Sequence, residues 1–122
     1  MRRWHLYFAS KYRKKVFTQE IYQRLKEVIY ETAKRHNIIV HELAGWSDHI
    51  HVLVESELEV GNIAQLLKGS SSYALRKEFP ELINEVHDKS LWASSYNSKE
   101  IIDDNYFYNC KQYIERHELS NS

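Results

Sequence analysis

The strongest pattern in the chain is a strict alternation of side chains over residues 49–54. Ile50, Val52 and Val54 fall on one face of a strand with this period, so that face is predicted to be buried. Another apolar run, over residues 38–46, precedes it and is followed by Ser-Asp, a pair typical of tight turns. We therefore predict two antiparallel strands, joined as a hairpin, in the middle of the chain.

Three other stretches carry apolar residues at helical spacing. One covers residues 19–36, where Thr18 is a suitable N-cap. Another covers residues 59–79 and ends before Pro80, although a Gly-Ser-Ser-Ser run is expected to interrupt it. The last extends from residue 103 to about residue 119, because two aspartates at its start suit helix capping and the helix dipole.

Two further strands complete the predicted fold, over residues 4–12 and 91–96. The resulting order, β-α-β-β-α-β-α, begins with the split βαβ plan of ferredoxin-like folds. We predict an α+β fold: a four-stranded antiparallel sheet with two helices on one face, plus a C-terminal helix that carries a tyrosine. The second face of the sheet needs a cover, for which that helix, a second subunit or a nucleic acid are the candidates.

Composition restricts the class of protein further. The chain has 122 residues, which fits a single domain over residues 1–122. Its 17 Lys and Arg residues balance 17 Asp and Glu residues, which excludes a protein that is basic throughout. The single cysteine excludes an intramolecular disulfide and a multi-cysteine zinc site. No apolar run approaches the roughly 20 residues of a membrane span, and no signal-peptide pattern is present, so we expect a soluble, cytoplasmic protein with no membrane partner.

Basic residues gather at the start of the chain. The first acidic residue is Glu20, and the basic residues before it are Arg2, Arg3, Lys11, Arg13, Lys14 and Lys15. Such an end presents either a cationic face to phosphates or an ordinary solvated surface. Lys11, Arg13 and Lys14 are the stronger candidates for a phosphate clamp. Further candidates lie beside Gly69, which lets a backbone approach closely: Lys68, Ser70 and Ser71.

Two histidines share one face of the alternating strand. His49 and His51 lie two residues apart, so both imidazoles leave the side opposite the apolar face. Their Cβ atoms would be about 7 Å apart, from a rise of roughly 3.3 Å per residue. Two imidazoles at that spacing can bind one divalent cation. The alternative is a pair of solvent-facing histidines on a half-exposed strand.

The last predicted helix carries a stripe of four residues at helical spacing: Tyr106, Cys110, Tyr113 and His117. Tyr113 and His117 are one turn apart and can address the same point in space. Such a stripe can also pack on the sheet, with the polar ends of Tyr and His at its edge. The spacing alone leaves both interpretations open.

These residues occur together with several matching segments. His49-Ile50-His51 forms a His-hydrophobic-His motif, and Tyr113 begins a Tyr-Ile segment in the last helix. The other segments, in the same order, are Trp4-His5-Leu6, Ser10-Lys11-Tyr12-Arg13, Trp46 to Val54, and Leu67 to Ser72. On these residues, and over nearly its whole length, the chain resembles the small single-tyrosine HUH transposases of bacterial and archaeal insertion sequences, the IS200-like family.

The resemblance implies a metal-dependent single-strand DNA endonuclease and strand transferase. Tyr113 would attack the scissile phosphate, keep a 5′-phosphotyrosine link and release a 3′-OH. His49 and His51 would hold Mg²⁺ or Mn²⁺, and His117 stands where the family usually has a third ligand, Gln. An imidazole there shifts the preference from Mg²⁺ toward softer ions. The family further implies DNA transposition and recombination by a homodimer that binds single-stranded DNA with hairpin ends, without a small-molecule cofactor.

Three alternatives stay open at this point. A domesticated relative that nicks and joins hairpin repeats would share the chemistry. A non-catalytic RRM-like module would bind nucleic acid on the same topology, but it needs aromatic side chains on its central strands. A structural metal-binding protein needs a closed ligand set, whereas two or three histidines suggest an open one.

Overall fold

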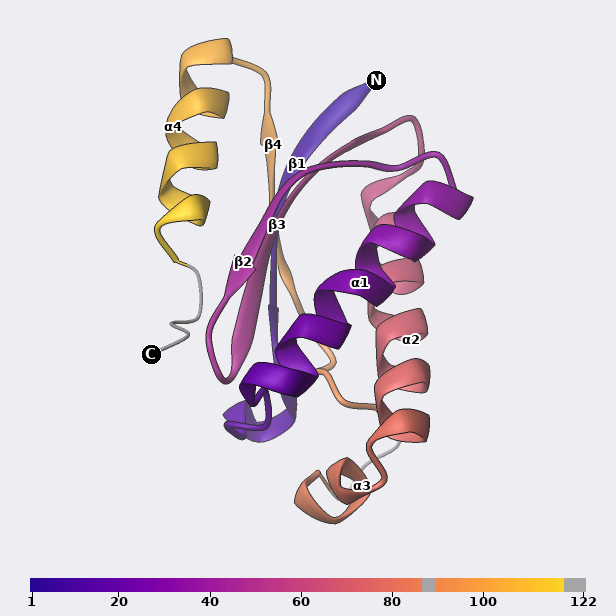
Figure 1. Ribbon diagram of the computed structural model, residues 1–122. Helices are drawn as coiled ribbons and strands as arrows, with labels where there is room; N and C mark the ends of the chain where they lie inside the picture. Colours follow the sequence, from indigo (N-terminus) through magenta and orange to yellow (C-terminus); the bar gives the residue numbers. More distant parts are fainter. Residues whose placement is uncertain (87–89, 118–122) are drawn as a thin grey trace.

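A computed structural model describes residues 1–86 and 90–117 of the chain. Its helices and strands are β1 (Arg2–Ala9), η1 (Lys11–Arg13), α1 (Gln19–Arg35), β2 (Ile39–Gly45), β3 (His49–Ser56), α2 (Val60–Glu78), α3 (Glu81–Glu85), β4 (Asn97–Ile101) and α4 (Asp104–Glu115). The strands form one antiparallel sheet in the order β2-β3-β1-β4 (Figure 1). The predicted α+β, ferredoxin-like fold is confirmed. Within the described residues, no helix combines the length and apolar character needed to cross a bilayer.

The sheet lies between two layers of helices. α1 and α2 cover one face, and α4 lies against the other (Figure 1). Ile50, Val52 and Val54 are fully buried in the core beneath α1 and α2, as the alternation predicts. Leu53 points to the opposite face and belongs to a smaller core with Ile114 of α4. The C-terminal helix, one of the three candidates, therefore covers the second face of the sheet.

Two helices begin at the predicted polar caps. The hydroxyl of Thr18 accepts a hydrogen bond from a backbone N–H in the first turn of α1 at 3.3 Å. The carboxylate of Asp103 accepts two such bonds at the start of α4, at 2.7 and 3.2 Å. These bonds satisfy N–H groups that have no partner within their own helix. α4 ends at Glu115, earlier than predicted, and residues 118 and 119 of the predicted helix lie outside the described residues.

The Gly-Ser-Ser-Ser run at residues 69–72 does not interrupt α2, so that prediction was wrong. The hydroxyl of Ser71 donates to the carbonyl of Leu67, one turn earlier, at 2.6 Å. Serine hydroxyls that bond in this way stay compatible with a continuous helix. A Cβ on Gly69 would meet nothing within 4 Å, so this glycine serves no close backbone approach within the described fold. A short helix that the pattern did not predict, α3, follows Pro80.

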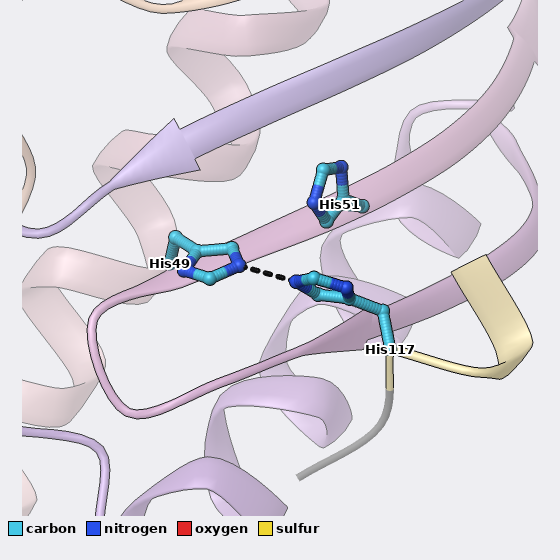
Figure 2. A group of neighbouring side chains, drawn as sticks. All are labelled: His49, His51 and His117. Atoms are coloured by element: carbon cyan, nitrogen blue, oxygen red, sulfur yellow. Dashed lines mark hydrogen bonds between the residues drawn. The ribbon is translucent and has the colours of Figure 1, made fainter. Parts of the chain in front are cut away.

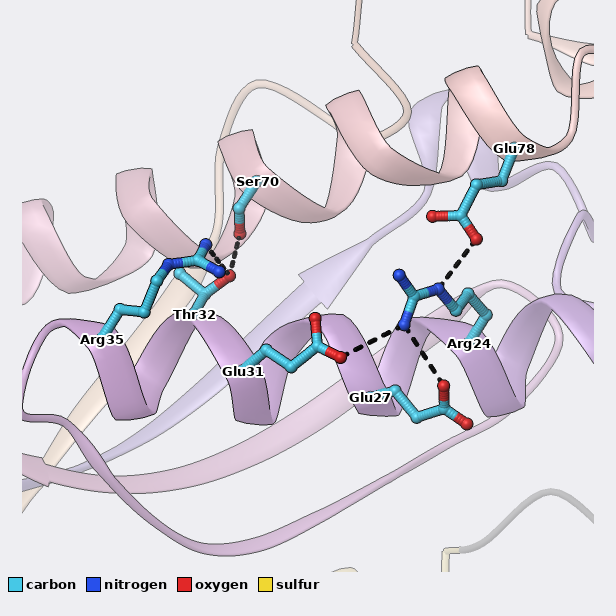
Figure 3. Close-up of polar contacts among 7 residues, drawn as sticks. All are labelled: Arg24, Glu27, Glu31, Thr32, Arg35, Ser70 and Glu78. Carbon is cyan, nitrogen blue, oxygen red and sulfur yellow. Dashed lines mark hydrogen bonds and ion pairs between the residues drawn. The ribbon is translucent and has the colours of Figure 1, made fainter.

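Polar contacts fix α1 against α2 (Figure 3). Thr32 donates to the hydroxyl of Ser70 at 2.8 Å, inside the interface between the two helices. At another point along it, Arg24 donates to Glu78 at 2.8 Å and also pairs with two glutamates of its own helix. These contacts lie on the face of the sheet that is turned away from α4.

The fourth strand lies later in the chain than predicted, so the prediction of a strand over residues 91–96 was wrong. Leu91 and Trp92 are buried, and the backbone of Trp92 pairs with Ser10 in an isolated bridge that lies outside the strands. Their apolar side chains fill the main core instead of extending the sheet. The polar segment that follows forms β4, because an edge strand can leave most of its side chains in solvent.

β1 ends at Ala9, three residues before the predicted end, and a tight 3₁₀ turn follows. Tyr12 (φ 58°) and Arg13 (φ 53°) both adopt the left-handed backbone region, which costs on the order of 1–3 kcal/mol for a residue with a side chain. Hydrogen bonds from the preceding backbone hold the turn in place: the N–H of Ser10 donates to the carbonyl of Asp48 at 2.9 Å. The turn is thereby fixed beside the β2–β3 hairpin.

Candidate functional site

Three histidines meet where β3 faces the end of α4 (Figure 2). His49 and His51 project from β3, and His117 follows α4. One ring nitrogen from each lies within 4.8 Å of the others. The Nε2 atoms of His49 and His117 are 2.6 Å apart and share a hydrogen bond (Figure 2).

The fold explains why these side chains meet. The alternation of β3 sends its histidines to the face that α4 covers, because the other face is committed to the main core. Ile114 is fully buried against that face, and Cys110 is nearly so, which fixes the axis of α4. The backbone N–H of His117 then donates to the carbonyl of Ile114 at 2.9 Å and turns the chain back toward β3.

An acid holds the second ring nitrogen of His49. Asp48 accepts from Nδ1 of His49 through Oδ1 at 2.7 Å, and Arg13 donates to the other carboxylate oxygen at 3.2 Å. Burial alone would raise the pKa of Asp48, but the hydrogen bonds from His49 and Arg13 outweigh it and lower the pKa. Asp48 is therefore an ionised acceptor at neutral pH.

His51 is held in a similar way by a residue of β1. Its Nδ1 lies 2.9 Å from Nε2 of His5, and the two nitrogens share a hydrogen bond. Burial, followed by the charges of His5, His117 and His49, lowers the pKa of His51 to about 3. Burial also lowers the pKa of His5 and of His117. His51 is consequently neutral at physiological pH and has a lone pair available for a metal ion.

The donor set fits a divalent metal. His49, His51 and His117 offer imidazole nitrogens, which suit the divalent transition metals, and the set is open because three protein ligands leave coordination positions for other groups. The environment is half-buried, with His51 the most enclosed at 8% exposure. The structure thus brings together all three residues predicted as metal ligands.

Tyr113 lies beside this cluster. Its ring centroid is 5.7 Å from that of His51 and 5.7 Å from that of His117, on which it stacks. The residue is 53% exposed, so a large substrate can reach it. A cavity of about 280 Å³ adjoins it, lined by His5, Tyr106, Asn109, Cys110 and Tyr113. The predicted nucleophile and the predicted metal ligands therefore come from one chain and face one region.

The basic residues predicted to bind DNA divide into two groups. Lys14 is exposed, and Lys11 is half-buried with its Nζ 5.6 Å from the Tyr12 ring. Arg13 also reaches solvent, but its guanidinium is paired with Asp48. All three lie in or beside the η1 turn, close to the hairpin that carries His49.

The other three predicted DNA contacts are used inside the fold. Lys68 donates to the carbonyl of Ala93 at 2.8 Å, and burial, followed by the charge of Lys11, lowers its pKa. The hydroxyl of Ser70 accepts a hydrogen bond from Thr32 of α1. Ser71 is fully buried, and its hydroxyl accepts a hydrogen bond from Nε1 of Trp92 at 2.9 Å. These residues lie on α2, across the sheet from the histidines.

No role for His5 or Asp48 was predicted from the sequence. Asp48 directly precedes the first histidine, which is a signal that sequence alone offers. The place of His5 in the site depends on the pairing of β1 with β3. In that register His5 lies opposite Leu53, on the face that carries His51. Tyr7, opposite His51, packs its ring 5.2 Å from both strand histidines.

Comparison with known proteins gives consistent matches. A family model described as "Transposase IS200 like" matches residues 2–117. The transposase of insertion sequence IS200 from Salmonella typhimurium is 28% identical over 96 residues, which cover 77% of this chain and 63% of that protein. The ISDra2 transposase TnpA of Deinococcus radiodurans is 26% identical over 95 residues, covering 76% of this chain and 68% of that protein. The chain thus spans less than two thirds of the length of the IS200 relative.

Solved structures share the fold. A crystal structure of a candidate transposase from Deinococcus radiodurans superposes with a TM-score of 0.76 at 24% identity, covering 98% of this chain and 94% of that one. A REP-associated tyrosine transposase bound to a REP hairpin gives a TM-score of 0.69 at 14% identity, covering 93% of this chain and 64% of that one. At these identities the likeness concerns the arrangement of the helices and strands.

Proposed function

The chain belongs to the IS200-like transposase family, and we propose that it cuts and rejoins single-stranded DNA through a covalent link to Tyr113. The observation that supports this most strongly is the meeting of three histidines with an exposed tyrosine on one side of the sheet. A purely structural metal site has no need for a solvent-exposed phenol beside it. A base-stacking module needs an open sheet face, and α4 covers part of this one.

In this proposal His49, His51 and His117 hold a divalent ion. When bound, such an ion polarises the scissile phosphate and stabilises the negative charge that develops on it. A protonated phenol is a poor nucleophile, so Tyr113 needs a nearby cation that stabilises its phenolate. The stacking of Tyr113 on His117 holds the phenol ring beside the metal ligands.

The transfer step conserves the number of phosphoester bonds. The Tyr113 oxygen forms a bond to phosphorus as the bond from phosphorus to the 3′ oxygen breaks. The phenolic proton is lost to solvent and the leaving 3′ oxygen takes one up, which gives a 5′-phosphotyrosine and a free 3′-OH. Since no phosphoester bond is lost to water, a 3′-OH can attack the link and rejoin DNA without ATP. This balance suits strand transfer better than simple hydrolysis.

We further propose that Mn²⁺ serves this site better than Mg²⁺, because all three protein ligands are imidazoles. Lys11 and Lys14, which lie in and directly after η1, are the contacts to DNA phosphates in this proposal, and Arg13 is left out because its guanidinium pairs with Asp48. Lys68, Ser70 and Ser71 are not included in this interface, since their polar atoms bond within the fold.

The assembly as a homodimer and the preference for hairpin-ended DNA are part of the proposal. A relative of similar fold binds a REP hairpin, so a domesticated hairpin-processing role is the second candidate.

The test is formation of a covalent protein–DNA adduct. The protein is incubated with Mn²⁺ and labelled single-stranded DNA that carries the hairpins from either side of its own gene, then denatured and resolved by electrophoresis. We expect a denaturant-resistant adduct with the wild-type chain and none with Tyr113→Phe. Tyr108→Phe is the matched control, because Tyr108 is 62% exposed on the same helix but makes no ring contact with the histidines. An unchanged adduct in Tyr113→Phe would refute the proposal.

A further inference from the structure

Both strand histidines are anchored through the same ring atom. Nδ1 of His49 meets Asp48 at 2.7 Å, and Nδ1 of His51 meets His5 at 2.9 Å. In each ring the anchored nitrogen is the one nearer the backbone, which leaves Nε2 to point away from the strand. A hydrogen bond to one nitrogen of a metal-binding histidine fixes both the tautomer and the ring orientation.

The first anchor has a defined hydrogen-bond direction. A carboxylate can only accept, so Asp48 requires the proton of neutral His49 to sit on Nδ1 and leaves a lone pair on Nε2. That same Nε2 atom lies 2.6 Å from Nε2 of His117. The atom that Asp48 makes available is therefore the one that faces the third histidine.

The carboxylate of Asp48 is in turn bound by Arg13, which belongs to a strained turn. Arg13 donates to its second oxygen through Nη2 at 3.2 Å and Nε at 3.4 Å. The Arg13 backbone is left-handed, directly after a second left-handed residue, Tyr12. Strain of this kind persists where the surrounding structure holds it, and here the strained turn presents a guanidinium to the acid that orients His49.

The second anchor comes from a different strand. His5 and His51 occupy neighbouring positions on β1 and β3, on the face that α4 covers, with ring centroids 5.1 Å apart. Tyr7 lies opposite His51 and packs against it on the same face, with ring centroids 5.2 Å apart. A donor at Nδ1 of His51 and an acceptor at Nε2 of His5 leave Nε2 of His51 with a lone pair, as in His49.

We propose that His5 and Asp48 are positioning residues that set the tautomer of His51 and His49, so that both present Nε2 to one divalent ion. This inference rests on the proposed function, because it assumes that the three histidines are the metal ligands. Neither residue is a ligand of the ion in this proposal. Each acts through the ring nitrogen that it holds.

The experiment measures binding of Mn²⁺ alone, by the electron paramagnetic resonance signal of the free ion, so it needs no DNA and no activity. His5→Phe and Asp48→Ala remove the anchors, whereas His5→Gln and Asp48→Asn keep an oxygen that can accept from Nδ1. We expect roughly 10- to 100-fold weaker binding in the first pair and recovery of most of that loss in the second. His41→Phe is the matched control, because His41 bonds Glu55 at 2.8 Å on the same sheet without contacting the cluster.

The outcomes separate the two proposals. Wild-type affinity in both His5→Phe and Asp48→Ala would overturn the positioning role and leave the metal site intact. Equal losses in the removing and the retaining variants would overturn it too, since the hydrogen bond would then not be the cause. Failure of the wild-type chain to bind Mn²⁺ at all would overturn both this inference and the proposed metal site. Urea unfolding of each metal-free variant checks that it is folded, and the His5 pair decides the question if Asp48→Ala does not fold.

Discussion

Protonation of His51 makes the stability of the metal-free protein depend on pH. The pKa of this side chain is about 3 in the folded chain, against 6.5 when unfolded, because burial and the charges of His5, His117 and His49 disfavour the cation. The unfolded chain therefore binds one more proton than the folded chain between these two values. Folding stability must then decrease as the pH falls from 6.5 toward 3, and it is fully retained above 6.5.

The magnitude follows from the width of that window. One proton corresponds to about 1.4 kcal/mol per pH unit, so lowering the pH to about 5 removes up to roughly 2 kcal/mol of unfolding free energy. Because His51 keeps a little contact with solvent, at 8% exposure, a loss of about 1–2 kcal/mol is expected. That is a large fraction of the stability of a small domain.

The assay is urea unfolding in the presence of a chelator at about pH 7.5 and about pH 5, for the wild-type chain and His51→Phe. Phenylalanine keeps an aromatic ring in the site but cannot take up a proton, so the variant should lose about 1–2 kcal/mol less between the two pH values. His36→Gln, at an exposed position after α1, controls for the removal of any one histidine. Equal losses in the wild-type chain and His51→Phe would refute the reasoning.

Three further substitutions have definite expected outcomes. His117→Gln should raise DNA cleavage with Mg²⁺ relative to Mn²⁺, because an amide oxygen is a harder ligand than imidazole; an unchanged ratio of the two rates would argue against His117 as a ligand. Gly45→Ala should cost about 1–3 kcal/mol in urea unfolding, since its Cβ would clash with the carbonyl oxygen of His49; wild-type stability would show that the hairpin is less tightly closed. Ser71→Ala should cost about 1–3 kcal/mol, because it leaves the buried Nε1 of Trp92 without its acceptor; its DNA affinity should stay unchanged, and a loss of affinity would restore Ser71 to the interface.

Most of the fold follows from short-range signals in the sequence. The alternation over residues 49–54 predicts both the buried face of β3 and the face that carries the histidines, since strand geometry fixes both at once. The caps Thr18 and Asp103 mark helix starts because their side chains bond backbone groups nearby in the sequence. β4 was misplaced because Leu91 and Trp92 look like a strand locally, and only the packed core decides that they fill it.

In the candidate site, too, some features follow from local spacing in the sequence and others only from the tertiary fold. The spacings of His49, His51, Tyr113 and His117 are visible in the sequence, because the first two lie on β3 and the other two lie on α4 and just after it. The contact between His5 and His51 depends on how β1 pairs with β3, and that register is a property of the whole sheet. The interior bonds of Ser70 and Ser71 depend on how α2 meets α1 and the Trp92 segment, so the sequence alone does not predict that both hydroxyls are bonded within the fold.

The most direct test of the central claim is to identify the residue that carries DNA in the adduct. The wild-type adduct formed with Mn²⁺ is digested with protease and nuclease, and the nucleotide-bearing peptide is located by tandem mass spectrometry. We predict a single phosphotyrosine linkage at Tyr113, joined to the 5′ end of the cut strand. A linkage at Tyr106 or Tyr108, or a strand cut that leaves no protein attached, would contradict the assignment.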